Sequence, residues 1–256
     1  MAAVKDVFQA LDRLAPFGTQ LDFDNAGFLA GRSEREVRKI LVALDITQAV
    51  AEEAGRWGAD LIVSHHPVIF HPVKAVTDRD ETGRVLLALI ENRISAICAH
   101  TNLDAAQGGV NDRLAAALEL ASPVPFEGEH IGRMGQAHRR GLPVREYAAF
   151  VKDRLNAAGV RFVDGGRPVE QVAVGGGSCG SMLHEAVESG CDTFVTADIK
   201  YDVFLEAKAL GLNLLDAGHY ATEQVVCPAL VDFLQKEFPA VQVRLSEVHR
   251  EAYESV

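Results

Sequence analysis

The chain has 256 residues, of which 48% are hydrophobic and 24% charged, so it can bury a sizeable core as one large domain or two lobes. Its net charge of −11 and the lack of a Lys/Arg-rich run argue against nucleic acid as a partner. No apolar run reaches the roughly 18 residues of a membrane span, and the N-terminus lacks a signal-peptide pattern. Four widely spaced cysteines without a CxxC motif indicate reduced thiols, and we expect a cytoplasmic protein.

An amphipathic helix is predicted at the N-terminus, where apolar residues recur at helical spacing from Val4 until Pro16. The next segment, LDFDNAGFLAGR, is predicted to be a loop because two glycines interrupt it. Its acidic residues, Asp22 and Asp24, either form turns or support a neighbouring site.

A βαβ unit follows from Lys39. KILVALD predicts a strand, TQAVAEEAGRWG a helix with Thr47 as its N-cap, and LIV a second, buried strand parallel to the first. His65 and His66 come directly after that strand, at the edge where open α/β sheets bind ligands. Adjacent residues leaving a strand point to opposite sides, so this pair suits two neighbouring metal ions. The alternative is a pair of histidines that hydrogen-bond in a loop.

A second strand end carries His100 and Asp104. The helix predicted from VLLALIENR leads to the strand SAICAH, and parallel pairing would bring His100 and Asp104 to the same edge as His65. Asp104 either caps the helix that begins near Asn111 or serves as the carboxylate that a metal site needs.

Prolines and glycines accumulate around residue 125, which predicts a boundary between two lobes. Further on, Gly175, Gly177 and Gly180 satisfy the GxGxxG spacing between a predicted strand and helix, with Asp198 at the end of a later strand. This turn either binds a nucleotide or another anion or lets a helix pack closely on a strand.

A third strand end is LNLLDAG, followed by the helix EQVVCPALVDFLQKEFP. If that helix has begun by His219, then His219 and Glu223 are one turn apart and face the same way. The two side chains would then offer one nitrogen and one carboxylate to an ion.

Three strand ends therefore each deliver a histidine, and two add a carboxylate. The candidate ligands are His65, His66, Asp104, His219 and Glu223. They suffice for two ions if one carboxylate bridges and water fills the remaining positions. Mixed nitrogen and oxygen ligands suit Zn, Mn, Fe or Co better than Ca, and the lack of thiolates argues against a structural zinc site.

The blocks SHHP, HTNLDAAQGGVND, GGGSCG, DIKYD and DAGHYATE resemble the signature of the Nif-three-like family, also known as GTP cyclohydrolase I type 2 homologs. The resemblance runs from FDNAGFLAG to the last helix and fits the short form, without an inserted middle domain. It implies an α/β fold, a two-lobed subunit with mixed and parallel sheets flanked by helices, and a ring-shaped homohexamer. The lobes would comprise residues 1–124 plus 217–256 and residues 125–216, with the metal site between them.

By the same resemblance, the candidate ligands match the family's dinuclear metal ligands, and His100 matches a further site histidine. His100 is the candidate proton shuttle, and Lys200 or Tyr201 would orient substrate or stabilise charge. Asp202 stands where the family usually has histidine, so no catalytic role for a histidine carries over there. Phe23 stands where tryptophan is common, which we interpret as a packing change.

The first functional hypothesis is a metal-dependent hydrolase for a small molecule, which the family name suggests is nucleotide-like. The second is a non-enzymatic protein that binds or delivers metal, or a scaffold that uses the ions structurally. A third hypothesis is a nucleotide-binding module centred on Gly175 to Gly180. The same ligands serve the first two, which differ in whether the metal is retained during turnover or passed to an acceptor.

Overall fold

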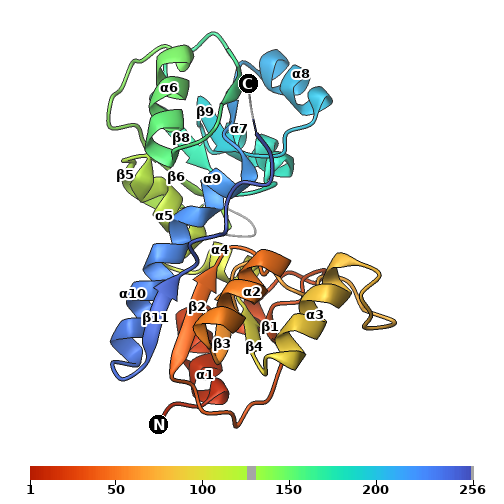
Figure 1. Cartoon of the computed structure of the whole chain (residues 1–256). Helices are drawn as coiled ribbons and strands as arrows, with labels where there is room; N and C mark the ends of the chain where they lie inside the picture. Colours follow the sequence, from red (N-terminus) through yellow and green to blue (C-terminus); the bar gives the residue numbers. More distant parts are fainter. Residues whose placement is uncertain (126–130, 255–256) are drawn as a thin grey trace. The chain divides into compact units, whose positions relative to one another are not determined.

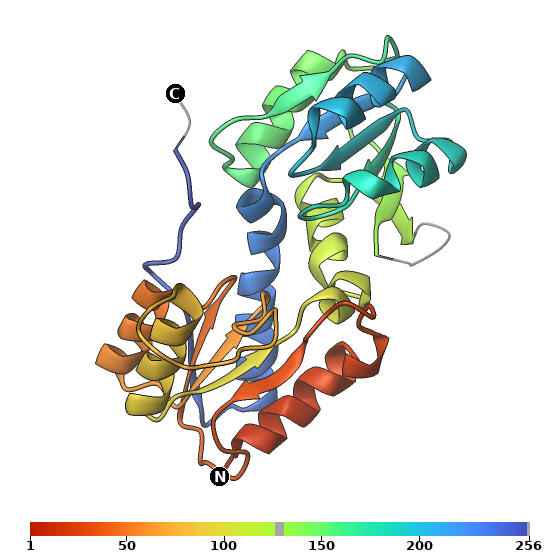
Figure 2. The same ribbon diagram turned by 90° about the vertical axis from the view of Figure 1, so that its right-hand side faces the viewer.

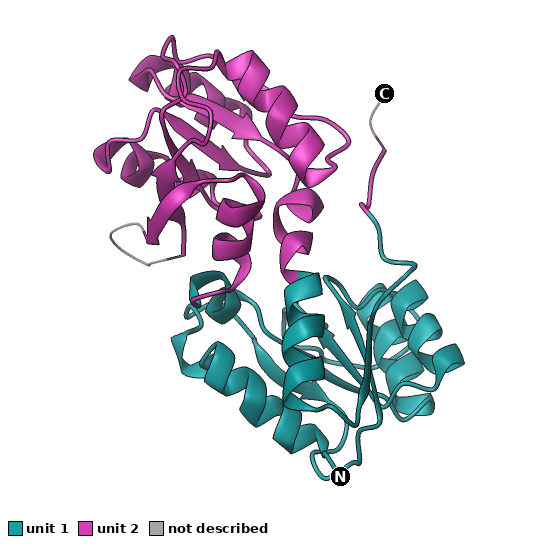
Figure 3. Cartoon of the chain, turned by 90° about the vertical axis from the view of Figure 1, so that its left-hand side faces the viewer, with its two compact units in different colours: residues 1–106, 227–250 teal, residues 107–226, 251–256 magenta. Residues whose placement is uncertain are grey.

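The computed structural model describes residues 1–125 and 131–254, and the chain divides into two compact units (Figure 3). Unit 1 comprises residues 1–106 and 227–250, and unit 2 comprises residues 107–226 and 251–256. The boundaries at 124 and 216 expected from the sequence fall within unit 2. The helices α5 (Val110–Ala117) and α9 (His219–Glu223) belong to unit 2 because their apolar side chains lie in its core.

Unit 1 is built on a five-stranded sheet in the order β1-β4-β3-β2-β11, in which β1 is antiparallel and the other pairs are parallel (Figure 1). Its strands are β1 (Gly27–Ala30), β2 (Lys39–Ala43), β3 (Leu61–Ser64), β4 (Ser95–Cys98) and β11 (Gln242–Leu245). Its helical elements are α1 (Val4–Leu14), η1 (Phe17–Thr19), α2 (Gln48–Trp57), α3 (Glu81–Glu91), α4 (Thr101–Ala105) and α10 (Cys227–Glu237). The predicted βαβ unit is confirmed, whereas β1 forms where the sequence suggested a loop.

The core of unit 1 follows the two-residue period of its strands. In β2, Leu41 and Ala43 face the cluster formed with α2 and α3, while the alternate residues Ile40 and Val42 are equally buried. Figure 2 shows α1 and α10 on the opposite side of the sheet from α2 and α3, so both faces are covered. Full burial of one such side chain stabilises the fold by about 1.5–3 kcal/mol. Because side chains on both faces are buried, the sheet is a rigid support for the loops at its edge.

Unit 2 contains a six-stranded mixed sheet in the order β5-β6-β8-β9-β10-β7, with β8, β9 and β10 parallel. Its strands are β5 (Ala121–Pro125), β6 (Arg133–Gln136), β7 (Arg161–Val163), β8 (Gln171–Val174), β9 (Thr193–Thr196) and β10 (Asn213–Asp216). Besides α5 and α9, its helical elements are α6 (Val144–Leu155), η2 (Gly180–Met182), α7 (Leu183–Glu188), α8 (Tyr201–Leu210) and η3 (Gln224–Val226).

Two apolar clusters cover the two faces of this sheet. Val172 and Val174 of β8 pack with α5 and α6, whereas Ala173 between them packs with α7 and α8. The helix predicted beyond the third strand end is divided, because α9 is followed by the short η3 before α10 begins. The observed architecture is therefore α/β with two mixed sheets flanked by helices, as the sequence predicted.

Strand register places the ends of neighbouring strands together in each unit. Ser64 of β3 pairs with Cys98 of β4 in unit 1, and Thr196 of β9 pairs with Asp216 of β10 in unit 2. Both pairs are parallel, so the residues that follow leave the sheet at the same edge. Each unit therefore has one edge at which polar side chains can converge.

Two predictions from composition can also be compared with the structure. Among residues 1–125 and 131–254, no helix combines the length and apolarity needed to cross a membrane. All four cysteines are thiols, as predicted, and burial raises the pKa of Cys98 and of Cys191 to about 11. A raised pKa leaves these two thiols protonated and chemically inert at neutral pH.

Candidate metal centre

Unit 1 gathers three histidines at the carboxyl edge of its sheet. His65 and His66 follow β3, and His100 follows β4. One ligand nitrogen from each lies within 4.8 Å of those from the other two. Parallel pairing of β3 and β4 produces this convergence, which confirms that His100 shares an edge with His65.

Each of these rings is oriented by a hydrogen bond from its Nδ1 to an oxygen atom. His65 Nδ1 lies 2.8 Å from the Ala99 carbonyl oxygen, His66 Nδ1 lies 2.7 Å from Asp45 Oδ1, and His100 Nδ1 lies 2.7 Å from Asp24 Oδ1. A carbonyl oxygen can only accept, so His65 Nδ1 carries the proton and its Nε2 carries the lone pair. Carboxylates and carbonyls hold metal-binding histidines in this way, with the other nitrogen directed to the metal.

Asp24, which accepts the hydrogen bond from His100, was predicted from the sequence either to form a turn or to support a neighbouring site. Its Oδ2 accepts from the Thr101 backbone N–H at 3.0 Å and from the Thr101 hydroxyl at 2.5 Å. Burial alone would raise the pKa of Asp24, but hydrogen bonds from His100 and Thr101 outweigh it and lower the pKa to about 2. Asp24 is therefore an ionised group that holds His100.

Asp45 was not identified as a site residue from the sequence. It ends the predicted strand KILVALD, however, and polar residues at the carboxyl ends of parallel strands meet at one edge of the sheet. Besides His66, Asp45 contacts Nε2 of His249 at 2.9 Å through its other oxygen. Burial opposes ionisation, but the hydrogen bonds from His249 and His66 hold the pKa of Asp45 well below its ordinary value. His249 lies in the segment after β11, to which no role was assigned from the sequence.

The segment after β11 is fixed to α2 by a buried carboxylate. Glu53 accepts from the Ser246 hydroxyl at 2.5 Å and from the Glu247 backbone N–H at 3.1 Å. These bonds hold His249 in reach of Asp45, so His66 is oriented through a chain of contacts that ends near the C-terminus.

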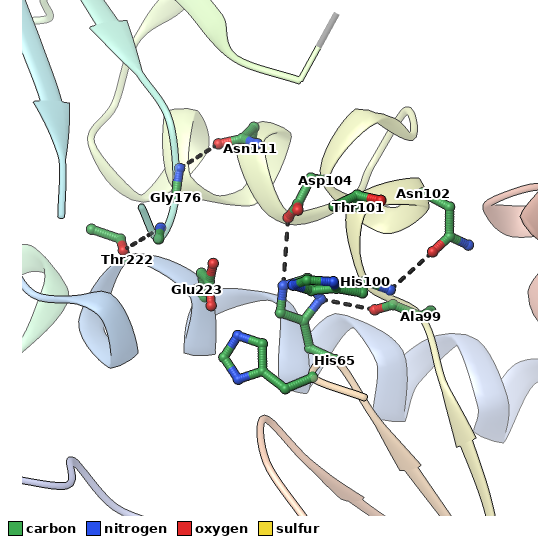
Figure 4. A network of polar contacts seen from close by, with 12 residues as sticks. His65, Ala99, His100, Thr101, Asn102, Asp104, Asn111, Gly176, Thr222 and Glu223 are labelled. Atoms are coloured by element: carbon green, nitrogen blue, oxygen red, sulfur yellow. Dashed lines mark hydrogen bonds and ion pairs between the residues drawn. The ribbon is translucent and has the colours of Figure 1, made fainter. Parts of the chain in front are cut away.

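Asp104 lies on α4 with its Oδ1 at 3.5 Å from His65 Nε2. It does not cap the next helix, because Gly109 is the N-cap of α5 and makes no side-chain capping bond. Two ligands of one ion at about 2.0–2.2 Å lie roughly 3–3.5 Å apart, so this separation suits metal binding. The contact between His65 and Asp104 is drawn in Figure 4.

Unit 2 brings together His219 and Glu223. The α9 helix begins at His219, so the prediction that His219 and Glu223 are one helical turn apart is confirmed. His219 Nε2 lies 3.0 Å from Glu223 Oε2. His219 Nδ1 donates to Asp198 Oδ2 at 2.7 Å. Asp198 has a φ of +54°, a left-handed conformation that costs a residue other than glycine roughly 1–2 kcal/mol. Strained backbone at a side chain that orients a candidate ligand is typical of functional sites.

The glycine turn after β8 packs directly against these two residues. A Cβ at Gly177 would lie 2.0 Å from Glu223 Oε1 and 3.1 Å from His219 Nε2, and the φ of Gly177 is +65°. Gly176 N–H donates to Asn111 Oδ1 at 2.7 Å and Gly177 N–H to Thr222 Oγ1 at 3.0 Å (Figure 4). These two amides are engaged inside the protein, which favours close packing at the turn and leaves two fewer donors for a nucleotide or anion.

Lys200 and Tyr201 lie at the start of α8, shortly after Asp198. Lys200 is the N-cap residue of α8, and Tyr201 is 78% exposed. Both residues are exposed on the surface of unit 2. Asp202 follows on the first turn of α8 and is exposed as well.

The donor set of each unit fits a divalent transition metal. In unit 1 it consists of imidazole nitrogens with one buried carboxylate, and in unit 2 of one imidazole with one buried carboxylate. Such mixed ligands suit Zn, Mn, Fe and Co. The glycine at position 177 leaves space beside the Glu223 carboxylate that a larger residue would fill.

Comparison with known proteins gives consistent matches along the chain. The model of the family described as Duf34/NIF3 (NGG1p interacting factor 3) matches residues 2–252. A protein of Clostridium perfringens named GTP cyclohydrolase 1 type 2 homolog is 33% identical over 241 residues, covering 91% of this chain and 90% of the relative. One of the same name from Streptomyces coelicolor is 39% identical over 238 residues, covering 89% of this chain and 84% of the relative.

Solved structures show the same fold. A hypothetical protein of Staphylococcus aureus superposes with a TM-score of 0.92 at 29% identity, covering 99% of both chains. A Bacillus cereus protein described as related to NIF3 also has a TM-score of 0.92, at 24% identity, covering 100% of this chain and 99% of the other.

Proposed function

Since this chain belongs to the Duf34/NIF3 family, we propose that it is a hydrolase that depends on two divalent metal ions. The proposed ligands are His65, His66, Asp104, His219 and Glu223. One observation supports this proposal most strongly. In both units, each histidine of the candidate site donates a hydrogen bond through Nδ1 to an oxygen of the protein. That pattern fixes each ring through Nδ1 and is the usual support for histidines that bind a metal through Nε2.

When bound, a pair of ions would polarise the electrophilic centre of a substrate and make water more acidic. The carboxylates of Asp104 and Glu223 are buried, so their charges would balance cations in a medium of low polarity. We assign the bridging role to Glu223, because a carboxylate shared by two cations reduces their mutual repulsion. The identity of the metal, among Zn, Fe, Mn and Co, is left to measurement.

His100 is the proposed proton shuttle. Its Nδ1 donates to Asp24, which is ionised at neutral pH, so the imidazolium formed when Nε2 takes a proton would be stabilised. The side chain of His100 is 17% exposed, which allows a proton to reach solvent. Lys200 and Tyr201 are proposed to orient substrate or to stabilise charge from unit 2.

The substrate class suggested by the names of the relatives is a nucleotide, opened at its ring as a cyclohydrolase would do. The test is to purify the chain without chelator, measure its metal content and assay nucleotides, phosphoesters and cyclic amides. We expect turnover that a chelator abolishes and added metal restores. Inactivity across the panel with both ions bound would contradict the hydrolase.

The competing function is metal delivery or scaffolding, since the same ligands serve it. Exposure of His219, whose side chain is 33% accessible, is the feature that favours exchange with an acceptor. Incubation with a metal-free acceptor protein separates the two: a carrier gives up its ions within minutes, whereas a catalytic centre keeps them during turnover. The homohexameric ring and the cytoplasmic location stay predictions, and analytical ultracentrifugation tests the first.

A further inference from the structure

Two phenylalanine rings lie exposed beside the histidines of unit 1. Phe23 is 64% exposed and Phe70 is 39% exposed, and their ring centroids are 6.5 Å apart at an interplanar angle of 64°. The interpretation of Phe23 as a packing change stays a prediction; in the structure its ring packs edge-to-face on Phe70 and is otherwise exposed. Phenylalanine gains most from burial, so a pair of rings left open to solvent at a candidate site calls for a ligand.

The position of the pair is fixed by neighbouring residues. Phe23 lies before β1 and Phe70 after β3, and the two loops are joined by Asn25, whose Nδ2 donates to the Ile69 carbonyl at 2.6 Å. The Phe70 ring also packs edge-to-face with His100, with centroids 6.0 Å apart. The exposure is thus held in place by specific contacts.

Three consecutive residues serve this one place in different ways. Phe23 presents its ring, Asp24 orients His100, and Asn25 joins the two loops. The aromatic pair is therefore continuous with the histidines and contributes an apolar surface beside their polar nitrogens.

We propose that Phe23 and Phe70 bind the flat heteroaromatic ring of the substrate by stacking, next to His100. This inference rests on the proposed function and adds to it the two residues that would recognise the ring of the substrate. A ligand that contacts both phenyl rings and imidazole nitrogens needs an apolar face and a polar edge, and a planar nitrogen heterocycle has both. Stacking of a base on an aromatic side chain contributes about 1–3 kcal/mol, enough for these residues to determine specificity.

The experiment compares metal-loaded wild type with Phe23→Leu and Phe70→Leu, which keep an apolar side chain but remove the aromatic face. Calorimetry measures the binding of guanosine monophosphate, adenosine monophosphate and ribose 5-phosphate, the last of which lacks the ring. We expect each substitution to weaken binding of both nucleotides roughly 5- to 150-fold, in line with the loss of one stacking contact. Ribose 5-phosphate should bind more weakly than either nucleotide and be unaffected by the substitutions.

Two further variants serve as controls. Val76→Ala changes another exposed apolar side chain, 41% accessible, in the loop that follows Phe70, and should leave nucleotide binding unchanged. Phe23→Trp keeps an aromatic face at this position, and the variant should bind the nucleotides at least as tightly as wild type.

Equal nucleotide binding by wild type and both leucine variants would overturn the inference, as would binding of ribose 5-phosphate as tight as that of the nucleotides. A change in sedimentation of the leucine variants with unaltered nucleotide affinity would assign the pair to contact with a second copy of the chain, which also overturns it. The proposed hydrolase fails differently: nucleotides would bind through Phe23 while no compound in the assay panel is turned over.

Discussion

The two units orient their histidines by different physical means. In unit 1 the acceptors are a backbone carbonyl and the carboxylates of Asp24 and Asp45, whose pKa values are lowered. In unit 2 the acceptor, Asp198, is half-exposed and sits in the left-handed conformation, while the Gly176 and Gly177 turn packs behind Glu223. Unit 1 therefore depends on charge, and unit 2 depends on backbone conformation. The comparison predicts that the two halves respond to different substitutions.

The largest expected effect is that of Glu223→Gln, which keeps the size of the side chain but removes its charge. If Glu223 bridges two ions, their repulsion is no longer offset, and the metal content should fall from two ions per chain toward one or none. Asp104→Asn, the matched change in unit 1, should lower the affinity for one ion only. Metal content by mass spectrometry decides, and an unchanged two-ion stoichiometry in Glu223→Gln would remove the bridging role.

Backbone dependence in unit 2 is tested by Gly177→Ala against Gly190→Ala. Both glycines have positive φ, but a Cβ at Gly190 meets nothing within 4 Å, whereas one at Gly177 meets the Glu223 carboxylate at 2.0 Å. Gly190→Ala should lower the free energy of unfolding by about 1 kcal/mol, from backbone strain alone. Gly177→Ala should lower it by roughly 1–3 kcal/mol more and reduce metal content. Equal denaturation midpoints would show that the turn can move away.

The third prediction separates stability from metal binding at Asp198. Replacement by glycine removes the strain of a φ of +54° but also the acceptor for His219. The free energy of unfolding of the metal-free protein should stay within about 1 kcal/mol of wild type, since relief of strain offsets the lost hydrogen bond. Metal affinity should fall about 10- to 100-fold. A parallel loss of both quantities in a chelator titration and a urea titration would mean that Asp198 serves folding alone.

The smallest effect is expected for Asp24→Asn in unit 1. The folded pKa of about 2 lies below that of an unfolded aspartate, so the ionised carboxylate stabilises the fold at neutral pH. This stabilisation, about 2 kcal/mol, is fully present above roughly pH 5 and is lost as the pH falls toward 2. Urea titrations of metal-free wild type and variant should therefore differ at pH 7 and converge near pH 2. Asp22→Asn, an exposed neighbour, should show no such pH-dependent difference.

Local patterns in the sequence were sufficient to predict the elements that carry the candidate ligands. Apolar runs predicted the buried strands before His65, His100 and His219, and the one-turn spacing of His219 and Glu223 held because α9 begins at His219. Strand ends of a parallel sheet converge by geometry, so the histidines of unit 1 could be brought to one edge without coordinates.

Tertiary structure decided the contacts made between segments far apart in the chain. Asp24 meets His100 across 76 positions, and His249, in the segment after β11, meets Asp45. Neither Asp24 nor His249 has a local sequence pattern that reveals its contact. An aspartate in a loop, for example, has the same sequence pattern whether it forms a turn or holds a histidine.

Exposure was equally beyond the sequence. No local pattern indicates how far Phe23 is exposed, and in the structure its ring lies on the surface, in a loop that Asn25 joins to Ile69. The glycines of the GxGxxG pattern were ambiguous for the same reason: whether their amides meet a phosphate or Asn111 and Thr222 depends on which elements pack against the turn. Hydrophobic periodicity is a local property that determines strands and helices, whereas the orientation of a polar side chain depends on neighbours that only the folded chain supplies.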